Sequence, residues 1–76
     1  MDYIGEIKMF GGDFEPKGWM FCDGRSLSSS RYPLLFSILG VMYGGNDVNF
    51  NIPNIPNLNG VGYIICVDGK YPERHI

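Results

Sequence analysis

The side chains best suited to chemistry in this sequence are a few carboxylates, two cysteines and a single tryptophan. Glu6 together with Asp13 or Asp23 would supply the pair of carboxyl groups that glycoside hydrolysis requires. The sequence does not give the separation of these groups, and short acidic residues beside glycines usually form turns. We therefore expect none of them to be catalytic.

Nucleophilic and phosphate-binding arrangements are also missing from the sequence. The single histidine, His75, has no second base beside it, so neither a Ser/His/Asp nor a Cys/His arrangement is credible. The pairs Gly11-Gly12 and Gly44-Gly45 lack the lysine and the following helix of a phosphate-binding loop. We expect no enzyme activity, no catalytic residue and no cofactor.

The two cysteines, Cys22 and Cys66, lie in apolar, strand-like segments. Cysteines in such segments usually behave as small buried hydrophobes, and this interpretation is favoured over the alternative of one disulfide between them. Neither cysteine has another close to it in the sequence, as zinc sites require, so no metal is expected.

Trp19 could stack on a sugar ring, which would point to a carbohydrate-binding module. In a small domain, however, a lone tryptophan is more often the main aromatic residue of the core. We therefore expect Trp19 to be buried with the apolar residues of the predicted elements. The residues expected in the core are Trp19, Phe21, Leu35, Ile38, Leu39, Tyr63, Ile64 and Ile65.

Length and composition limit the kind of fold that positions these groups. The 76 residues predict one domain, residues 1–76, with a small core that usually needs help from disulfides, metals or partner subunits. A hydrophobic content of 45% excludes a disordered chain, and a net charge of −2 without a basic block argues against nucleic-acid binding. No apolar run is long enough to predict membrane insertion. The sequence does not open on a secretory pattern, so release from a cell is expected through assembly or lysis.

Two strands are predicted in the first third of the sequence. Residues 3–10 alternate loosely between polar and apolar side chains and predict the first. A break at residues 11–13 and the turn residues Pro16-Lys17-Gly18 separate it from a second, short strand over residues 19–22. We expect the two strands to form a meander or a hairpin with a long loop.

One amphipathic helix is predicted in the middle of the sequence. Its apolar stripe has the spacing i, i+3, i+4 and i+7 and comprises Leu35, Ile38, Leu39 and Met42. Ser29 or Ser30 is expected to cap its N-terminus, and Gly40 is expected to end it. One helix beside short antiparallel strands predicts an α+β fold in which the helix packs on one face of a sheet.

The second half of the sequence contains an asparagine-rich loop and then a final strand. Two prolines in residues 51–56 exclude a central strand and a helix, so we expect an extended loop with its isoleucines in a surface groove. This loop is either an ordered turn region or a face for a polar ligand or a neighbouring subunit. Residues 61–67 are continuously apolar and predict a strand that is central or lies at a subunit interface. The residues expected at such an interface are Ile52, Pro53, Asn54, Ile55, Pro56, Tyr63 and Ile65.

A series of short motifs runs in order through nearly the whole sequence. They are Gly5-Glu6-Ile7 with Phe10, Pro16-Lys17-Gly18-Trp19, Cys22-Asp23-Gly24, the run from Leu34 to Gly40, Tyr43-Gly44-Gly45, Phe50, Pro56-Asn57-Leu58-Asn59-Gly60, the run from Tyr63 to Val67, and Tyr71-Pro72-Glu73-Arg74. Together these motifs resemble the phage tail collar domain family, here with an extension that carries the additional Asn-Ile-Pro.

The resemblance implies a structural function. It implies a component of a phage tail or tail-fibre assembly, a collar or connector module that supports host attachment, made in the host cytoplasm and located in the virion. Its partners would be itself, as a homotrimer, and other tail or fibre proteins, with only indirect contact to the host surface. Two alternatives stay open: a secreted or surface carbohydrate-binding module, and a part of a tail-derived bacteriocin or contractile injection system.

One departure from the family pattern affects these expectations. Many members carry a long insertion with glycine and histidine residues before the last strand, whereas Gly60 is here joined almost directly to that strand. The resemblance therefore implies a minimal module without a receptor-binding head and without bound iron or zinc.

Overall fold

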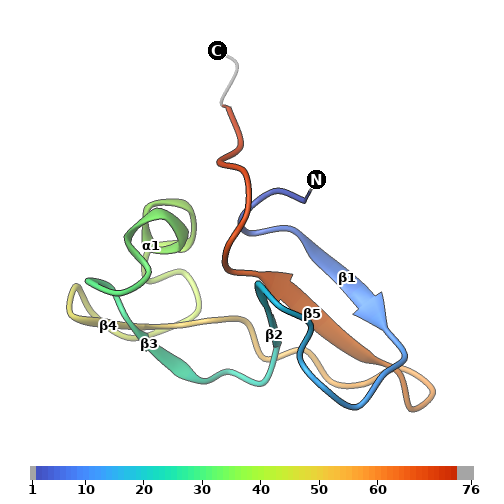
Figure 1. Cartoon of the computed structure of the whole chain (residues 1–76). Coiled ribbons are helices and arrows are strands. Elements are labelled where there is room, and N and C mark those ends of the chain that lie inside the picture. Colours follow the sequence, from blue (N-terminus) through green and yellow to red (C-terminus); the bar gives the residue numbers. More distant parts are fainter. Residues whose placement is uncertain (1, 74–76) are drawn as a thin grey trace.

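Five short strands and one helix make up the computed structural model, which describes residues 2–73 (Figure 1). In chain order they are β1 (Ile7–Phe10), β2 (Trp19–Phe21), β3 (Ser26–Ser28), α1 (Pro33–Leu39), β4 (Asn49–Asn51) and β5 (Gly62–Cys66). The strands form a three-stranded antiparallel sheet in the order β1-β5-β2 and a separate pair, β3-β4. The predicted α+β fold of short antiparallel strands with one helix is confirmed.

The last strand, β5, lies at the centre of the three-stranded sheet (Figure 1). Ile65 is paired with Ile7 of β1 on one side and with Met20 of β2 on the other. Ile64 and Ile65 point to opposite faces and are 1% and 0% exposed, which explains the continuous apolar run. The prediction of a central strand is confirmed. The predicted β1–β2 hairpin is wrong, because each of these strands pairs with β5 and not with the other.

The pair β3–β4 lies outside the sequence-based prediction. Leu27 of β3 is paired with Phe50 of β4, and both side chains are buried, at 8% and 0% exposure. Serines flank Leu27 and asparagines flank Phe50, so each strand is a single apolar residue between two polar ones. This pattern has the period of two that is typical of a half-buried strand. Over only three residues, however, it cannot be distinguished from a loop in the sequence.

The helix begins at Pro33, one residue after Tyr32, which occupies the N-cap position without a capping side-chain hydrogen bond. The predicted serine cap is wrong, because the serines have other partners. Ser29 donates its hydroxyl to the backbone oxygen of Asp47 at 2.6 Å, and the hydroxyl of Ser30 lies 2.9 Å from that of another serine. Ser29 therefore ties the end of β3 to the segment before β4.

The end of α1 follows the prediction. Gly40 has a φ of +54° and its N–H donates to the carbonyl of Phe36 at 2.7 Å, so the helix stops at this glycine. Leu35 and Leu39 face the core and are buried. Met42, the fourth residue of the predicted stripe, lies beyond the helix and is 72% exposed.

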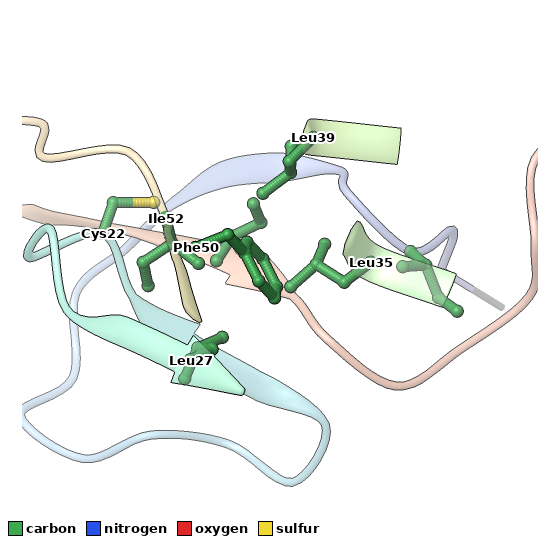
Figure 2. Packing of buried hydrophobic residues seen from close by; sticks show 8 residues of the cluster. Cys22, Leu27, Leu35, Leu39, Phe50 and Ile52 are labelled. Carbon is green, nitrogen blue, oxygen red and sulfur yellow. The ribbon is translucent and has the colours of Figure 1, made fainter. Parts of the chain in front are cut away.

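The core consists of two clusters on opposite sides of the three-stranded sheet. The main cluster lies between this sheet, α1 and the β3–β4 pair, and Figure 2 shows Phe50 among Leu27, Leu35 and Ile52. Its buried members are Ile4, Cys22, Leu27, Leu35, Leu39, Phe50, Ile52 and Ile65. The second cluster, on the other face, comprises Trp19, Ile64 and Cys66 with Phe10 and Phe21 packed against it.

The predicted core residues divide into two groups. Five are buried, namely Trp19, Leu35, Leu39, Ile64 and Ile65. The other three, Phe21, Ile38 and Tyr63, are partly buried and pack against one of the two clusters. Phe50 and Ile52 are buried but lie outside the predicted set, because the polar residues beside them make their segments resemble loops.

Candidate functional site

Two of the three carboxylates considered as a catalytic pair from the sequence, Glu6 and Asp23, take part in local structural contacts. Glu6 accepts the backbone N–H of Tyr3 at 3.2 Å, within the turn that leads into β1. Asp23 is bound by Arg25, and Asp13 is exposed in the loop between β1 and β2. These contacts are typical of acidic residues in turns and ion pairs.

A three-residue charge cluster is the most connected polar feature of the described residues. Arg25 donates from Nε to Oδ1 of Asp23 at 3.0 Å and from Nη2 to Oδ2 of the same carboxylate at 2.9 Å. Its Nη2 also forms an ion pair with Oε2 of Glu15. The hydrogen bond from Arg25 lowers the pKa of Asp23, and the two carboxylates raise the pKa of Arg25. Asp23 is therefore held ionised beside a permanent cation, which suits a structural ion pair.

The charge cluster closes one edge of the three-stranded sheet. Oε2 of Glu15 accepts the outward-facing N–H of Phe21 at 2.8 Å. The N–H of Trp19 donates to the carbonyl of Pro16 at 2.9 Å, and the carbonyl of Phe21 accepts from the N–H of Asp23 at 2.9 Å. Because these backbone N–H and C=O groups are already hydrogen-bonded within the chain, they are not free to pair with a strand of another molecule.

The two cysteines are free, buried thiols, as the sequence predicts. Cys22 is 4% exposed in the main cluster, and Cys66 is 1% exposed in the second cluster across the sheet. Burial, assisted by the charge of Asp23, raises the pKa of Cys22 to about 11, and burial also raises the pKa of Cys66. Thiols of this kind are poor nucleophiles and poor metal ligands.

Within residues 2–73, no three or more His, Cys, Asp or Glu side chains gather as a metal ion would require. His75, which the sequence analysis singled out, lies outside the described residues.

Trp19 is covered and offers no open face to a sugar. Its side chain is 9% exposed, and Nζ of Lys8 lies 4.5 Å from the ring centroid. Lys8 is also 3.8 Å from Oδ1 of Asp2. A stacking platform needs an exposed aromatic face, and here a cation from β1, the opposite edge strand of the sheet, lies over the ring.

The predicted interface residues fall into three groups of different exposure. Ile52, Pro53 and Ile65 are buried in their own chain, so their side chains are part of the core and do not face a neighbour. The groove expected for the isoleucines is therefore the core itself, because the chain turns inward directly after β4. Ile55 and Tyr63 are partly buried, and they pack against the main cluster. Asn54 and Pro56 are exposed.

Seven exposed apolar side chains lie at two other places. Four of them, which we call the loop patch, follow α1: Val41 at 48%, Met42 at 72%, Tyr43 at 45% and Val48 at 68% exposure. Three lie on and near β1, where Ile7 is 37%, Met9 46% and Phe14 62% exposed. Contiguous exposed apolar surface on a small domain usually marks a contact with another molecule.

An open groove of about 610 Å³ lies between the start of α1 and the turn after β5. Trp19, Met20 and Leu35 are among its apolar lining residues, and Glu15 contributes a carboxylate that is already paired with Arg25. The only helix among residues 2–73, α1, has seven residues and is too short to cross a membrane.

Comparison with known proteins shows which family this chain resembles. The family model described as Phage Tail Collar Domain matches residues 5–61. Protein RhiB of Rhizobium leguminosarum bv. viciae is 44% identical over 48 residues, which cover 58% of this chain and 22% of that protein. The short tail fiber protein gp12 of Enterobacteria phage T4 is 39% identical over 59 residues, or 76% of this chain and 11% of that protein. The chain thus spans less than a quarter of either relative's length, but it belongs to the phage tail collar domain family.

Proposed function

We propose that this chain is a structural component of a phage tail or tail-fibre assembly, where it acts as a collar or connector module that supports host attachment. The observation that carries the proposal is the family match over residues 5–61, since this family is generally structural. Similarity to the short tail fiber protein of phage T4 over 76% of the chain favours a location in the virion.

The chemistry of the described residues supports a module that acts by association. Its most connected carboxylates, Glu15 and Asp23, are both paired with Arg25, and its thiols are buried. The surface also carries exposed apolar side chains, notably those of the loop patch. Burial of such surface against another molecule is favourable by about 25 cal/mol per Å² of apolar area.

The proposed partners are other copies of the chain and other tail or fibre proteins. The family resemblance favours a homotrimer, and the small core of a domain of this size favours help from partner subunits. Asn54 and Pro56, the exposed members of the predicted interface, are candidates for such contacts together with the loop patch.

The turn before β5 supports a connector function over direct receptor binding. Leu58 and Val61 exchange backbone hydrogen bonds, each 2.9 Å long, around Asn59 and Gly60, which have φ values of +52° and +80°. Two central residues with positive φ are typical of a tight hairpin turn. This turn occupies the point where many family members carry an inserted head, so contact with the host surface would be indirect.

Mass spectrometry of purified particles from a producing host tests the proposal. We expect peptides of this chain in intact particles, together with tail or fibre proteins. Absence of the chain from purified particles would contradict the proposal, as would binding of the isolated chain to host cells or to a glycan array. Particles that contain the chain but no nuclease-protected DNA would identify a tail-derived bacteriocin or an injection system.

A further inference from the structure

The two edges of the three-stranded sheet differ in how their backbone groups are satisfied. The β2 edge is closed by the loop before it, through Glu15 and Pro16. The β1 edge is open. The N–H of Cys66 in β5 donates to the carbonyl of Glu6, the residue before β1. Along an antiparallel strand, every second residue directs its backbone N–H and C=O at the same neighbour. Counting from Glu6, the backbone groups of Ile7 and Met9 therefore point away from β5. No residue among 2–73 forms a hydrogen bond with these outward groups.

The side chains of β1 make this edge apolar. Ile7 and Met9 lie on the same face of the sheet and are 37% and 46% exposed. Lys8, whose charge would normally protect an edge strand from pairing, lies on the other face above the ring of Trp19. An open backbone edge beside exposed apolar side chains favours the addition of another strand.

Two antiparallel registers of β1 with a second copy of itself are disfavoured. If Ile7 paired with Met9 of the second copy, Lys8 would lie directly opposite Lys8, and like charges in that position are destabilising. If Ile7 paired with Ile7, Lys8 would face Glu6 of the second copy, but Met9 would face Gly5, which has a φ of +89° and whose N–H already donates to Cys66 and is not free for a second strand.

The third register has neither defect. With Met9 opposite Met9 of the second copy, Ile7 faces Gly11, which is exposed and has open space on its Cα among the described residues. On the other face, Lys8 lies opposite Phe10 of the second copy, so no like charges face each other there.

We propose that two copies of this chain join through their β1 strands, antiparallel across a two-fold axis, with Met9 opposite Met9. The occupant of the open edge is thus a second copy, and the two sheets become one continuous sheet. This contact goes beyond the proposed function. It joins copies in pairs, so it is separate from a three-fold association and holds whether or not the chain is part of a tail.

Cysteine cross-linking of the full chain tests the register. In the proposed contact the two Cα atoms of residue 9 would lie about 5.5 Å apart, within the range of disulfides, whereas those of residue 7 would lie about 14 Å apart. We expect Met9→Cys to form a covalent dimer under a mild oxidant such as oxidised glutathione, and Ile7→Cys to form none. Ile7 is the matched control because it lies on the same strand and face. The native thiols are buried and do not compete.

A second variant measures association without a covalent bond. Met9→Lys keeps the backbone groups but places two like charges opposite each other, so we expect light scattering to show loss of the paired species while the melting curve stays cooperative.

Three results would overturn the proposed contact. They are equal or absent cross-linking of the two cysteine variants, cross-linking to a different protein, and a Met9→Lys mass equal to that of the wild type. None of them bears on whether the chain is found in purified particles.

Discussion

The carboxylate of Glu15 accepts the backbone N–H of Phe21, with 2.8 Å between Oε2 and N. This contact makes the three-stranded sheet asymmetric, because a side chain of the same molecule closes the β2 edge while the backbone groups of β1 face outward. The same carboxylate pairs with Arg25, which also binds Asp23, one of the carboxylates considered for catalysis from the sequence.

The Glu15 contact should contribute measurably to stability. We expect Glu15→Ala to lower the free energy of unfolding by about 1–2 kcal/mol, because it leaves the Phe21 N–H without its acceptor and Arg25 without one of its carboxylates. Glu15→Gln keeps an oxygen for the N–H and should lose about 0.5 kcal/mol, the size of a half-exposed ion pair. Urea unfolding followed by Trp19 fluorescence measures both, and equal losses would contradict the assigned acceptor role.

Phe50 should be the most sensitive aromatic residue in the chain. It is fully buried, and Phe→Ala in a core usually costs about 3–5 kcal/mol. A domain of this size seldom has more than about 3–5 kcal/mol in total, so Phe50→Ala should be largely unfolded by far-UV circular dichroism. Phe14→Ala is the control, since Phe14 is 62% exposed and forms a T-shaped pair with Phe10, worth about 1 kcal/mol. A folded Phe50→Ala variant would contradict the described core.

Gly45 should not tolerate a side chain. Its φ is +95°, and a Cβ there would lie 2.3 Å from the carbonyl oxygen of Asn49, so Gly45→Ala must displace the loop from β4. The matched control is Gly60→Ala, which has a φ of +80° but no described atom within 4 Å of the added Cβ. We expect a loss of about 1 kcal/mol for Gly60→Ala from backbone strain alone and a clearly larger loss for Gly45→Ala. Thermal melts of both variants measure these losses of stability. Equal losses would contradict the close approach of Gly45 to the backbone of Asn49.

The buried thiol of Cys22 predicts a loss of stability at high pH. Burial raises its pKa from 9.0 to about 11, so the unfolded chain releases the proton before the folded chain does. The contribution of the protonated Cys22 thiol to the free energy of unfolding is therefore complete below pH 9, and it is lost as the pH rises towards 11. Urea unfolding of the wild type and of Cys22→Ala over this range should show a steeper decline for the wild type. Parallel curves, or rapid labelling of the folded protein by a thiol reagent at neutral pH, would contradict this prediction.

Local sequence patterns predicted the elements whose apolar residues form a regular stripe or a continuous run. The apolar stripe of α1, the stop at Gly40 and the buried run of β5 are each visible within a few residues. The pairs β3–β4 and Glu15–Arg25 are not, because each depends on contacts between segments far apart in the chain. The hairpin expected between β1 and β2 fails for the same reason, since the strand that separates them arrives about forty residues later.

The prediction of the candidate site was more accurate for what is buried than for what is exposed. Apolar character correctly indicated buried cysteines and a covered Trp19. It placed Ile52 and Ile65 at an interface, although both lie in the core, because a sequence does not distinguish the core of a chain from a contact between chains. The exposed methionines Met9 and Met42 carry no such signal, and only the structure places them at the surface.

The central claim is that this collar-domain chain functions by association and not by catalysis. The most direct test is the mass of the isolated chain by multi-angle light scattering across a wide range of concentrations, together with its melting curve. We predict a mass of more than one chain, with the share of associated species rising with concentration. A mass of one chain at every concentration, with a cooperative melt, would contradict the claim.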